Sequence, residues 1–201
     1  GEPLPEKPVV ITFDDGYLSN YTLAYPILQK YNMKATIFVI GVSFGKDHYK
    51  DTGYAMTPHF GAAEAKEMTD SGLISIQSHT YDMHQWPPYE DGSAAVRENI
   101  LPLAGESEEA YVRALTEDFT KSRAQLEDAT GQPVDVLAYP AGQYSTLAQV
   151  TLQGLGVHVT LSTNPGVNTV VKGLPQTLYA MLRFGITDDI TPAALLALIG
   201  A

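Results

Sequence analysis

Two adjacent carboxylates end the first apolar run of the chain. The stretch TFDDG, residues 12–16, directly follows the apolar residues PVVI and places Asp14 beside Asp15. Successive strand side chains point to opposite faces and like charges repel each other, so this pair is an awkward end for a core strand. An ordinary Asp-Gly turn is one interpretation. The other is that the two carboxylates do chemistry, and the rest of the chain must decide between them.

Two histidines follow a later apolar run. LISIQ, residues 73–77, leads into SHTYDMH, which places His79 and His84 five positions apart. On an α-helix this spacing separates two side chains by about 140°, so a shared ligand must be met from a turn rather than from a helical face. Two imidazoles and a carboxylate, with positions left open for water, are the ligands that a hydrolytic metal site requires. One Asp of the pair then binds the metal, and its neighbour is left beside the bound water as a base.

A third motif, LAYPAGQY, spans residues 137–144. Pro140 and Gly142 interrupt a strand pattern there, and a main-chain N–H of the resulting turn can face a developing oxyanion. An ordinary Pro-Gly turn is the alternative. The remaining histidines, His48, His59 and His158, are predicted to have structural roles.

The elements that must position these motifs are short apolar runs, which predict buried strands. They are Val9 to Phe13, Ala35 to Ile40, Leu73 to Gln77, Val136 to Tyr139 and Val157 to Leu161. Helical patterns separate or follow them, at about Asn20 to Tyr31, Gly61 to Ser71, Glu108 to Ala129, Ser145 to Gly154 and Pro192 to Ile199. Strands alternating with helices predict an α/β fold with a parallel sheet, open or closed into a barrel, and an active site at the carboxyl ends of the strands.

Composition narrows the class of protein. The 201 residues fit one domain, 1–201, with residues 1–7 read as a linker remnant, and a monomer is expected. A net charge of −11 with only 12 Lys and Arg argues against nucleic acid and anionic membranes as partners. No apolar run is long enough for a membrane span. The chain has no cysteine, so His, Asp and Glu are the expected metal ligands.

Taken together, TFDDG, SHTYDMH, LAYPAGQY and a late LRFGI resemble the motifs of the polysaccharide deacetylase family, carbohydrate esterase family four. The form of the second and third motifs is most similar to the branch that acts on biofilm poly-N-acetylglucosamine. The resemblance implies a distorted (β/α) barrel with fewer than eight regular units. It also implies a metal-dependent hydrolase that removes acetyl groups from N-acetylglucosamine units of a cell-surface or extracellular polysaccharide. An extracytoplasmic location follows, although the chain itself contains no export signal.

The resemblance assigns roles to the motif residues. Asp14 is the general base, the metal ligands are Asp15, His79 and His84, and the backbone N–H of Ala141 faces the oxyanion. One divalent metal is expected, zinc by default, with nickel, cobalt, iron or manganese also suited to this ligand set. The predicted substrate contacts are Tyr139, Pro140, Trp86 and Arg183, with the indole of Trp86 stacking on a sugar ring.

Two departures from the family pattern leave alternatives open. Many relatives have an Arg that orients the base where this chain has Ala138, and Arg183 is a candidate to replace that cation. The late Leu-His motif, which supplies the general acid in many relatives, is absent because Leu182 is followed by Arg183. In the branch that the chain most resembles, that histidine is expected before the TFDDG strand, so we expect the natural protein to be longer at its N-terminus. A non-catalytic carbohydrate-binding module and an O-acetyl esterase remain alternative functions.

Overall fold

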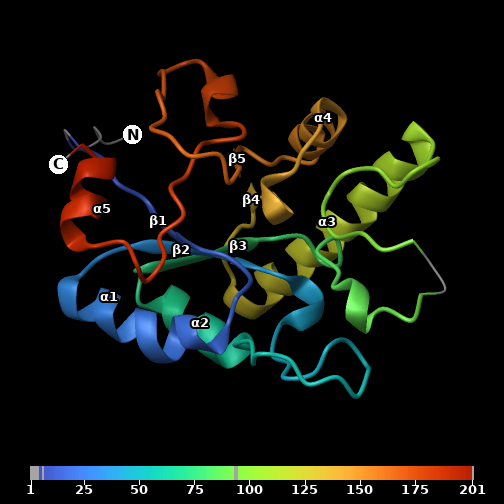
Figure 1. Ribbon diagram of the computed structural model, residues 1–201, viewed down its shortest axis with the longest axis horizontal. Helices are drawn as coiled ribbons and strands as arrows, with labels where there is room; N and C mark the ends of the chain where they lie inside the picture. The colour runs from blue at the N-terminus through green and yellow to red at the C-terminus, as the bar shows by residue number, and fades with distance from the viewer. Residues whose placement is uncertain (1–4, 6, 93–94, 201) are drawn as a thin grey trace.

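The computed structural model describes residue 5, residues 7–92 and residues 95–200 (Figure 1). Apart from residues 5 and 7, the predicted linker at residues 1–7 therefore lies outside the described residues. None of the described helices is both long and apolar enough to cross a bilayer.

A five-stranded parallel sheet forms the centre of the fold (Figure 1). Its strands lie side by side in chain order, namely β1 (Ile11–Phe13), β2 (Ala35–Val39), β3 (Ile74–Ser78), β4 (Val136–Ala138) and β5 (Val159–Leu161). The register pairs Phe13 with Ile37, Val39 with Ser78, and Ser78 with Leu137. Because every strand runs in the same direction, the residues that follow β1, β3 and β4 emerge at one edge of the sheet.

Helices follow the strands, as the sequence predicts. They are α1 (Tyr25–Tyr31), α2 (Ala62–Asp70), α3 (Glu108–Thr130), α4 (Thr146–Gly154) and α5 (Pro192–Leu198). The predicted helix from Asn20 is divided, because its first part, η1 (Asn20–Ala24), is a π-helix. Single 3₁₀ turns occur at η2 (Gly41–Ser43), η3 (Pro87–Tyr89), η4 (Pro140–Gly142) and η5 (Pro175–Leu178).

The longest helix, α3, has identifiable start and stop signals. The Ser107 side chain accepts a hydrogen bond from the Ala110 N–H, and Gly131 ends the helix in the left-handed conformation with φ 70°. Ser is a favoured N-cap, and Gly adopts positive φ without a Cβ penalty. The helix therefore extends one residue beyond the pattern predicted at about Glu108 to Ala129.

Two apolar cores lie where the helices pack on the sheet. The first joins α1 and α2 to the first three strands, through residues such as Leu28, Met68 and Ile76. The second joins α3 and α4 to β4, through residues such as Phe119, Leu152 and Leu137. A strand order that advances always in one direction places successive helices on one face, which is how a sheet curls toward a barrel. The observed architecture, a curled half-barrel of five parallel strands with helices, confirms the predicted distorted (β/α) barrel.

Candidate metal centre and active site

The Asp pair lies in a tight turn at the end of β1. Asp15 has φ 70° and Gly16 has φ 86°, and the Gly16 N–H donates to the Asp14 carbonyl at 2.9 Å. The conformation favours glycine, and a Cβ on Gly16 would also lie in tight contact with the Val39 side chain, 3.1 Å from its Cγ2. The left-handed residue interrupts strand alternation, which allows the two carboxylates to face different partners.

Asp15 meets the two histidines of the loop after β3. Oδ1 of Asp15 lies 3.5 Å from Nε2 of His79 and 3.9 Å from Nε2 of His84. One ligand atom from each of the three residues lies within 4.8 Å of the other two, and among the described residues this is the one such group of three. The imidazole rings stand nearly perpendicular, at 88°, with centroids 5.3 Å apart. A single ion can therefore be reached by all three side chains.

The second nitrogen of each ring is held by the backbone. Nδ1 of His79 lies 2.8 Å from the Ala138 carbonyl oxygen, and Nδ1 of His84 lies 3.1 Å from that of Glu98. A backbone carbonyl oxygen has no proton to donate, so the Nδ1 of each ring carries the N–H of this hydrogen bond, and Nε2 is the nitrogen left for a metal. Burial lowers the pKa of His79, which favours the neutral form that binds metals. The donor set thus fits a divalent transition metal.

The other carboxylate of the pair is held by an arginine. Nη1 and Nη2 of Arg183 donate to Oδ1 and Oδ2 of Asp14 at 2.7 and 2.9 Å, a bidentate ion pair. Nε of Arg183 donates to the Ser162 carbonyl at 2.8 Å, which fixes the plane of the guanidinium. Burial raises the pKa of Asp14, but the Arg183 hydrogen bonds and the positive charges nearby outweigh it, and the net shift is downward. Asp14 is therefore held as a carboxylate.

Arg183 reaches Asp14 because its segment runs beside β5. Met181 forms an isolated parallel bridge with Leu161, and its N–H donates to the Thr160 carbonyl at 2.8 Å. Two residues later, the backbone N–H of Arg183 donates to Asn164. The candidate cation that the sequence suggested in place of Ala138, Arg183, thus pairs with Asp14. Ala138 itself is fully buried.

The turn after β4 has the geometry of a constrained backbone loop. Ala141 has φ 52° and ψ 17°, and its side chain is exposed. Around it, the N–H of Gly142 donates to the Tyr139 carbonyl at 2.8 Å. A Cβ on Gly142 would lie 2.1 Å from Oγ1 of Thr163, so no larger residue fits there. The turn is rigid, as an oxyanion donor requires, and the role of the Ala141 N–H remains a prediction.

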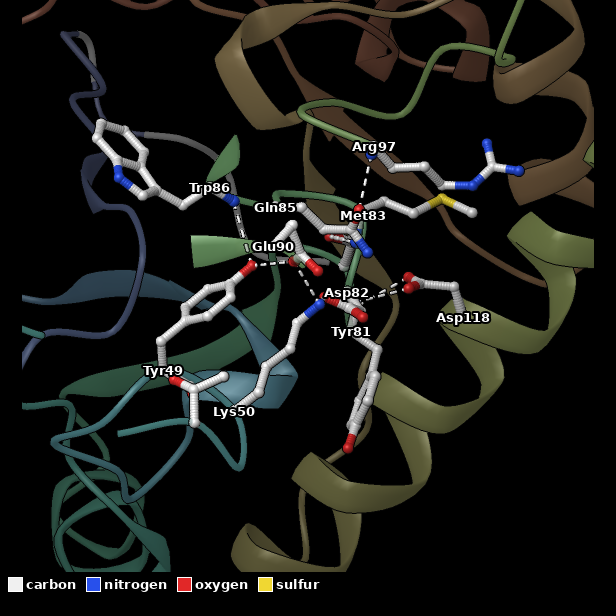
Figure 2. A network of polar contacts seen from close by, with 12 residues as sticks. Tyr49, Lys50, Tyr81, Asp82, Met83, Gln85, Trp86, Glu90, Arg97 and Asp118 are labelled. Carbon is white, nitrogen blue, oxygen red and sulfur yellow. Dashed lines mark hydrogen bonds and ion pairs between the residues drawn. The ribbon is translucent and has the colours of Figure 1, made fainter. Parts of the chain in front are cut away.

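Two predicted substrate contacts need correction. The side chain of Tyr139 is fully buried in the second core and Pro140 is buried as well. A side chain with no accessible surface, as in Tyr139, cannot touch a polysaccharide, and the buried Pro140 has little surface to offer, so both residues support the turn instead. The ring of Tyr139 stacks on Tyr144 with centroids 4.9 Å apart. Trp86 is 58% exposed, and Figure 2 shows its indole pointing away from the polar network; its contact with sugar stays a prediction.

The remaining histidines lie outside the ligand trio. His48 is exposed and pairs with Asp47 at 2.7 Å, and His158 is exposed. His59 is buried against Tyr17, with ring centroids 4.8 Å apart. Burial, together with the charge and hydrogen bond of Asp15, raises the pKa of Tyr17 to about 12, so its phenol stays protonated beside that carboxylate. The sequence analysis did not predict that Tyr17 lies at the site, although Tyr17 is only two residues after Asp15.

Comparison with known proteins decides the family. The family model described as polysaccharide deacetylase matches residues 1–160. The chain belongs to the polysaccharide deacetylase family. The sequence-based identification is thereby confirmed.

Named relatives of this family member include two curated proteins and a solved structure. YxkH of Bacillus subtilis, which carries the family's name, is 32% identical over 94% of this chain and 55% of its own length. The poly-beta-1,6-N-acetyl-D-glucosamine N-deacetylase of Escherichia coli K12 is 28% identical over 90% of this chain and 29% of its own. IcaB from Ammonifex degensii superposes with a TM-score of 0.76 at 29% identity, covering 98% of this chain and 75% of that one. The chain thus spans about half or less of the length of these curated relatives.

Proposed function

We propose that this polysaccharide deacetylase is a metal-dependent N-deacetylase, which removes acetyl groups from N-acetylglucosamine units of a cell-surface or extracellular polysaccharide. One observation carries the proposal. A trio of Asp15, His79 and His84 lies beside a second carboxylate, Asp14, that an arginine keeps ionised. A pure binding module has no need of a held base next to a metal site.

The trio would hold one divalent cation, with zinc as the default and nickel, cobalt, iron or manganese as other choices. When bound, such an ion supplies Lewis-acid polarisation of a carbonyl oxygen and lowers the pKa of a coordinated water. The residues of the chain position the ligand atoms. Asp15 and the two Nε2 atoms face one point, and their Nδ1 hydrogen bonds keep the rings in the required tautomer.

Asp14 accepts the proton of the attacking water. Its two oxygens are oriented by Arg183, and the lowered pKa keeps it unprotonated at neutral pH. The attack on the acetamide carbonyl develops negative charge on oxygen, and the Ala141 N–H in the rigid turn after β4 donates to it. The C–N bond then breaks and the leaving nitrogen takes up one proton, which balances the proton that Asp14 accepted from water, so the products are acetate and a glucosamine unit.

The substrate class rests on the relatives. The Escherichia coli protein is named for poly-beta-1,6-N-acetyl-D-glucosamine, and that polymer class is assigned here by similarity. The net charge of −11 suits a product polymer that gains amino groups. The proposal also includes that the substrate is a biofilm or cell-wall polymer outside the cytoplasm and that the protein is secreted or exposed at the cell surface. It includes a monomeric state and a single catalytic domain over 1–201.

The test is acetate release. The protein is stripped of metal, reloaded with each candidate ion in turn, and incubated with oligomers of β-1,6-linked N-acetylglucosamine. Release that depends on added metal supports the proposal. Binding of the oligomer without acetate release under any metal would replace it with a carbohydrate-binding module, and turnover of an O-acetyl ester without turnover of the amide would replace it with an O-acetyl esterase.

A further inference from the structure

The loop between the two histidines is held by side chains at four consecutive backbone N–H groups. The acceptors are Oγ of Ser78 for Thr80 at 3.1 Å, Oδ1 of Asp118 for Tyr81 at 2.8 Å, Oδ2 of Asp118 for Asp82 at 2.7 Å, and Oγ1 of Thr80 for Met83 at 3.2 Å. Two of these acceptors belong to the same short segment. Asp118 comes from α3, 36 and 37 residues further along the chain.

Asp118 lies on a helix with several fully buried side chains. It lies on α3 beside Leu115 and Phe119, which are fully buried. One helical turn later, Ser122 places its Oγ 2.8 Å from Oγ of Ser78 at the end of β3, so the same face of α3 binds both the loop and the strand that precedes it. Figure 2 shows the Asp118 carboxylate pointing from α3 toward the backbone of this loop.

The opposite side of the loop is also bound. The N–H of Gly41 donates to the Thr80 carbonyl at 3.0 Å, and the N–H of Val42 donates to that of Tyr81 at 2.9 Å. A Cβ on Gly41 would lie 2.4 Å from Cδ2 of Tyr81, so the two segments are in close contact. Thr80 has φ 69°, a conformation that costs energy for a branched residue and needs surrounding contacts to hold it.

Each oxygen of the Asp118 carboxyl accepts one of these bonds, and the ionised form accepts them best because neither oxygen carries a proton. Burial raises the pKa of Asp118 to about 6, while the N–H groups of Tyr81 and Asp82 lower it. The group is thus charged at neutral pH. A second side chain, Lys50, lies 3.0 Å from Oδ1 of Asp82 and ties the loop to the 47–55 hairpin (Figure 2).

We propose that Asp118 is a positioning residue of the metal centre. It holds the Tyr81-Asp82 backbone so that the imidazoles of His84 and His79 and the carboxylate of Asp15 can bind the same ion. The proposal rests on the metal-dependent function proposed above. Partners of metal ligands typically change metal affinity or activity by about 10- to 100-fold when they are removed, and Asp118 is such a partner acting through the backbone.

The experiment compares Asp118→Asn with Glu117→Gln. Both changes remove one negative charge from α3, but Glu117 is exposed and no hydrogen bond from its side chain holds the loop among the described contacts. Asn keeps the shape of Asp and one acceptor oxygen, so the fold is retained, and circular dichroism verifies this. Zn²⁺ affinity is measured by chelator competition, the Co²⁺ spectrum is recorded at saturating metal, and kcat and KM are determined on the acetylated oligomer.

Asp118→Asn is expected to bind Zn²⁺ about 10- to 100-fold more weakly, to alter the Co²⁺ spectrum and to lower kcat with little change in KM, while Glu117→Gln behaves like the parent protein. Parent-like affinity, spectrum and kcat in Asp118→Asn would overturn the inference and leave the proposed function standing. Equal losses in both variants would also overturn it, because a general charge effect explains them. A parent protein that binds Zn²⁺ but releases no acetate refutes the proposed function, and the affinity and spectrum still test the role of Asp118.

Discussion

The proposed metal ligands, Asp15, His79 and His84, lie in a tightly packed region, whereas Arg183, the partner of Asp14, lies in a loosely packed one. The segments that carry the trio follow β1 and β3, and Ile37 and Val39 of β2 and Ile76 of β3 are almost fully buried. Arg183 belongs to the C-terminal part of the chain, where no described residue from 163 to 200 is buried, and α5 has no buried side chain. The match to the family model also ends at residue 160.

This difference shows that apolar packing stabilises one half of the site, whereas polar contacts stabilise the other. The proposed ligands follow strand ends above an apolar core, where packing leaves few alternative conformations. Arg183 is held by hydrogen bonds along β5 and by its own ion pair with Asp14, which is only partly buried. Metal binding should therefore tolerate changes in the C-terminal part, whereas the ionisation of the base should not.

The largest expected effect is on the trio. His84→Ala should abolish metal retention at neutral pH and reduce acetate release to background, while leaving the fold intact because His84 contributes little core burial. Metal content by atomic spectroscopy and circular dichroism check this. His158→Ala, which changes an exposed histidine, should retain both properties. Full metal stoichiometry in His84→Ala would contradict the ligand assignment.

Asp14→Asn tests the proposed base without changing a proposed metal ligand. Metal should stay bound, and kcat should fall by about 10²- to 10⁴-fold, as for removal of a general base. Metal content and steady-state rates on the same sample measure the two properties. Asp128→Asn on the exposed side of α3 is the matched control. If metal is lost and Asp15→Asn retains it, the roles of the two carboxylates are exchanged.

Arg183→Ala tests the loosely packed half directly. Arg183 lowers the pKa of Asp14, and burial raises it, so removal of the guanidinium raises that pKa. The base is active when ionised, and the acidic limb of the kcat/KM profile must therefore move to higher pH. A rate loss of about 10- to 100-fold at neutral pH is expected from the lost orientation.

Two variants control this result. Arg113→Ala on α3 removes an exposed arginine and should leave the profile unchanged. Arg183→Lys keeps the charge without the bidentate geometry and should give an intermediate profile. An acidic limb that stays in place in Arg183→Ala would mean that Asp14 is not the group that titrates.

The smallest expected effect concerns packing alone. Leu196 in α5 is 51% exposed, and Leu196→Ala should change the free energy of unfolding by less than about 0.5 kcal/mol. Leu115→Ala in α3, at a fully buried position, should cost about 2–5 kcal/mol. Urea denaturation of both variants measures the contrast. A comparable loss in Leu196→Ala would show that the C-terminal part is packed as tightly as the rest.

Much of the fold was readable from local patterns. The apolar runs predicted all five strands to within two residues at either end, because a strand buried between layers needs a continuous apolar stretch. The predicted helix at Pro192 to Ile199 agrees with local chemistry, because the Thr191 side chain caps α5 by accepting from the Ala194 N–H. The starts of β1 and β5 were placed two residues too early, since apolar character alone does not show where pairing begins.

The sequence by itself determined which residues are the proposed ligands and base, because TFDDG and SHTYDMH carry them within a few residues of strand ends that a parallel sheet brings together. Only the tertiary structure decided which distant groups serve them. Arg183 pairs with Asp14 across 169 residues, and Asp118 holds the loop of His84 from another helix. It also buried Tyr139, which its motif had suggested as a substrate contact. A side chain's partner across such separations depends on how packed elements align, and no local pattern in the chain encodes that alignment.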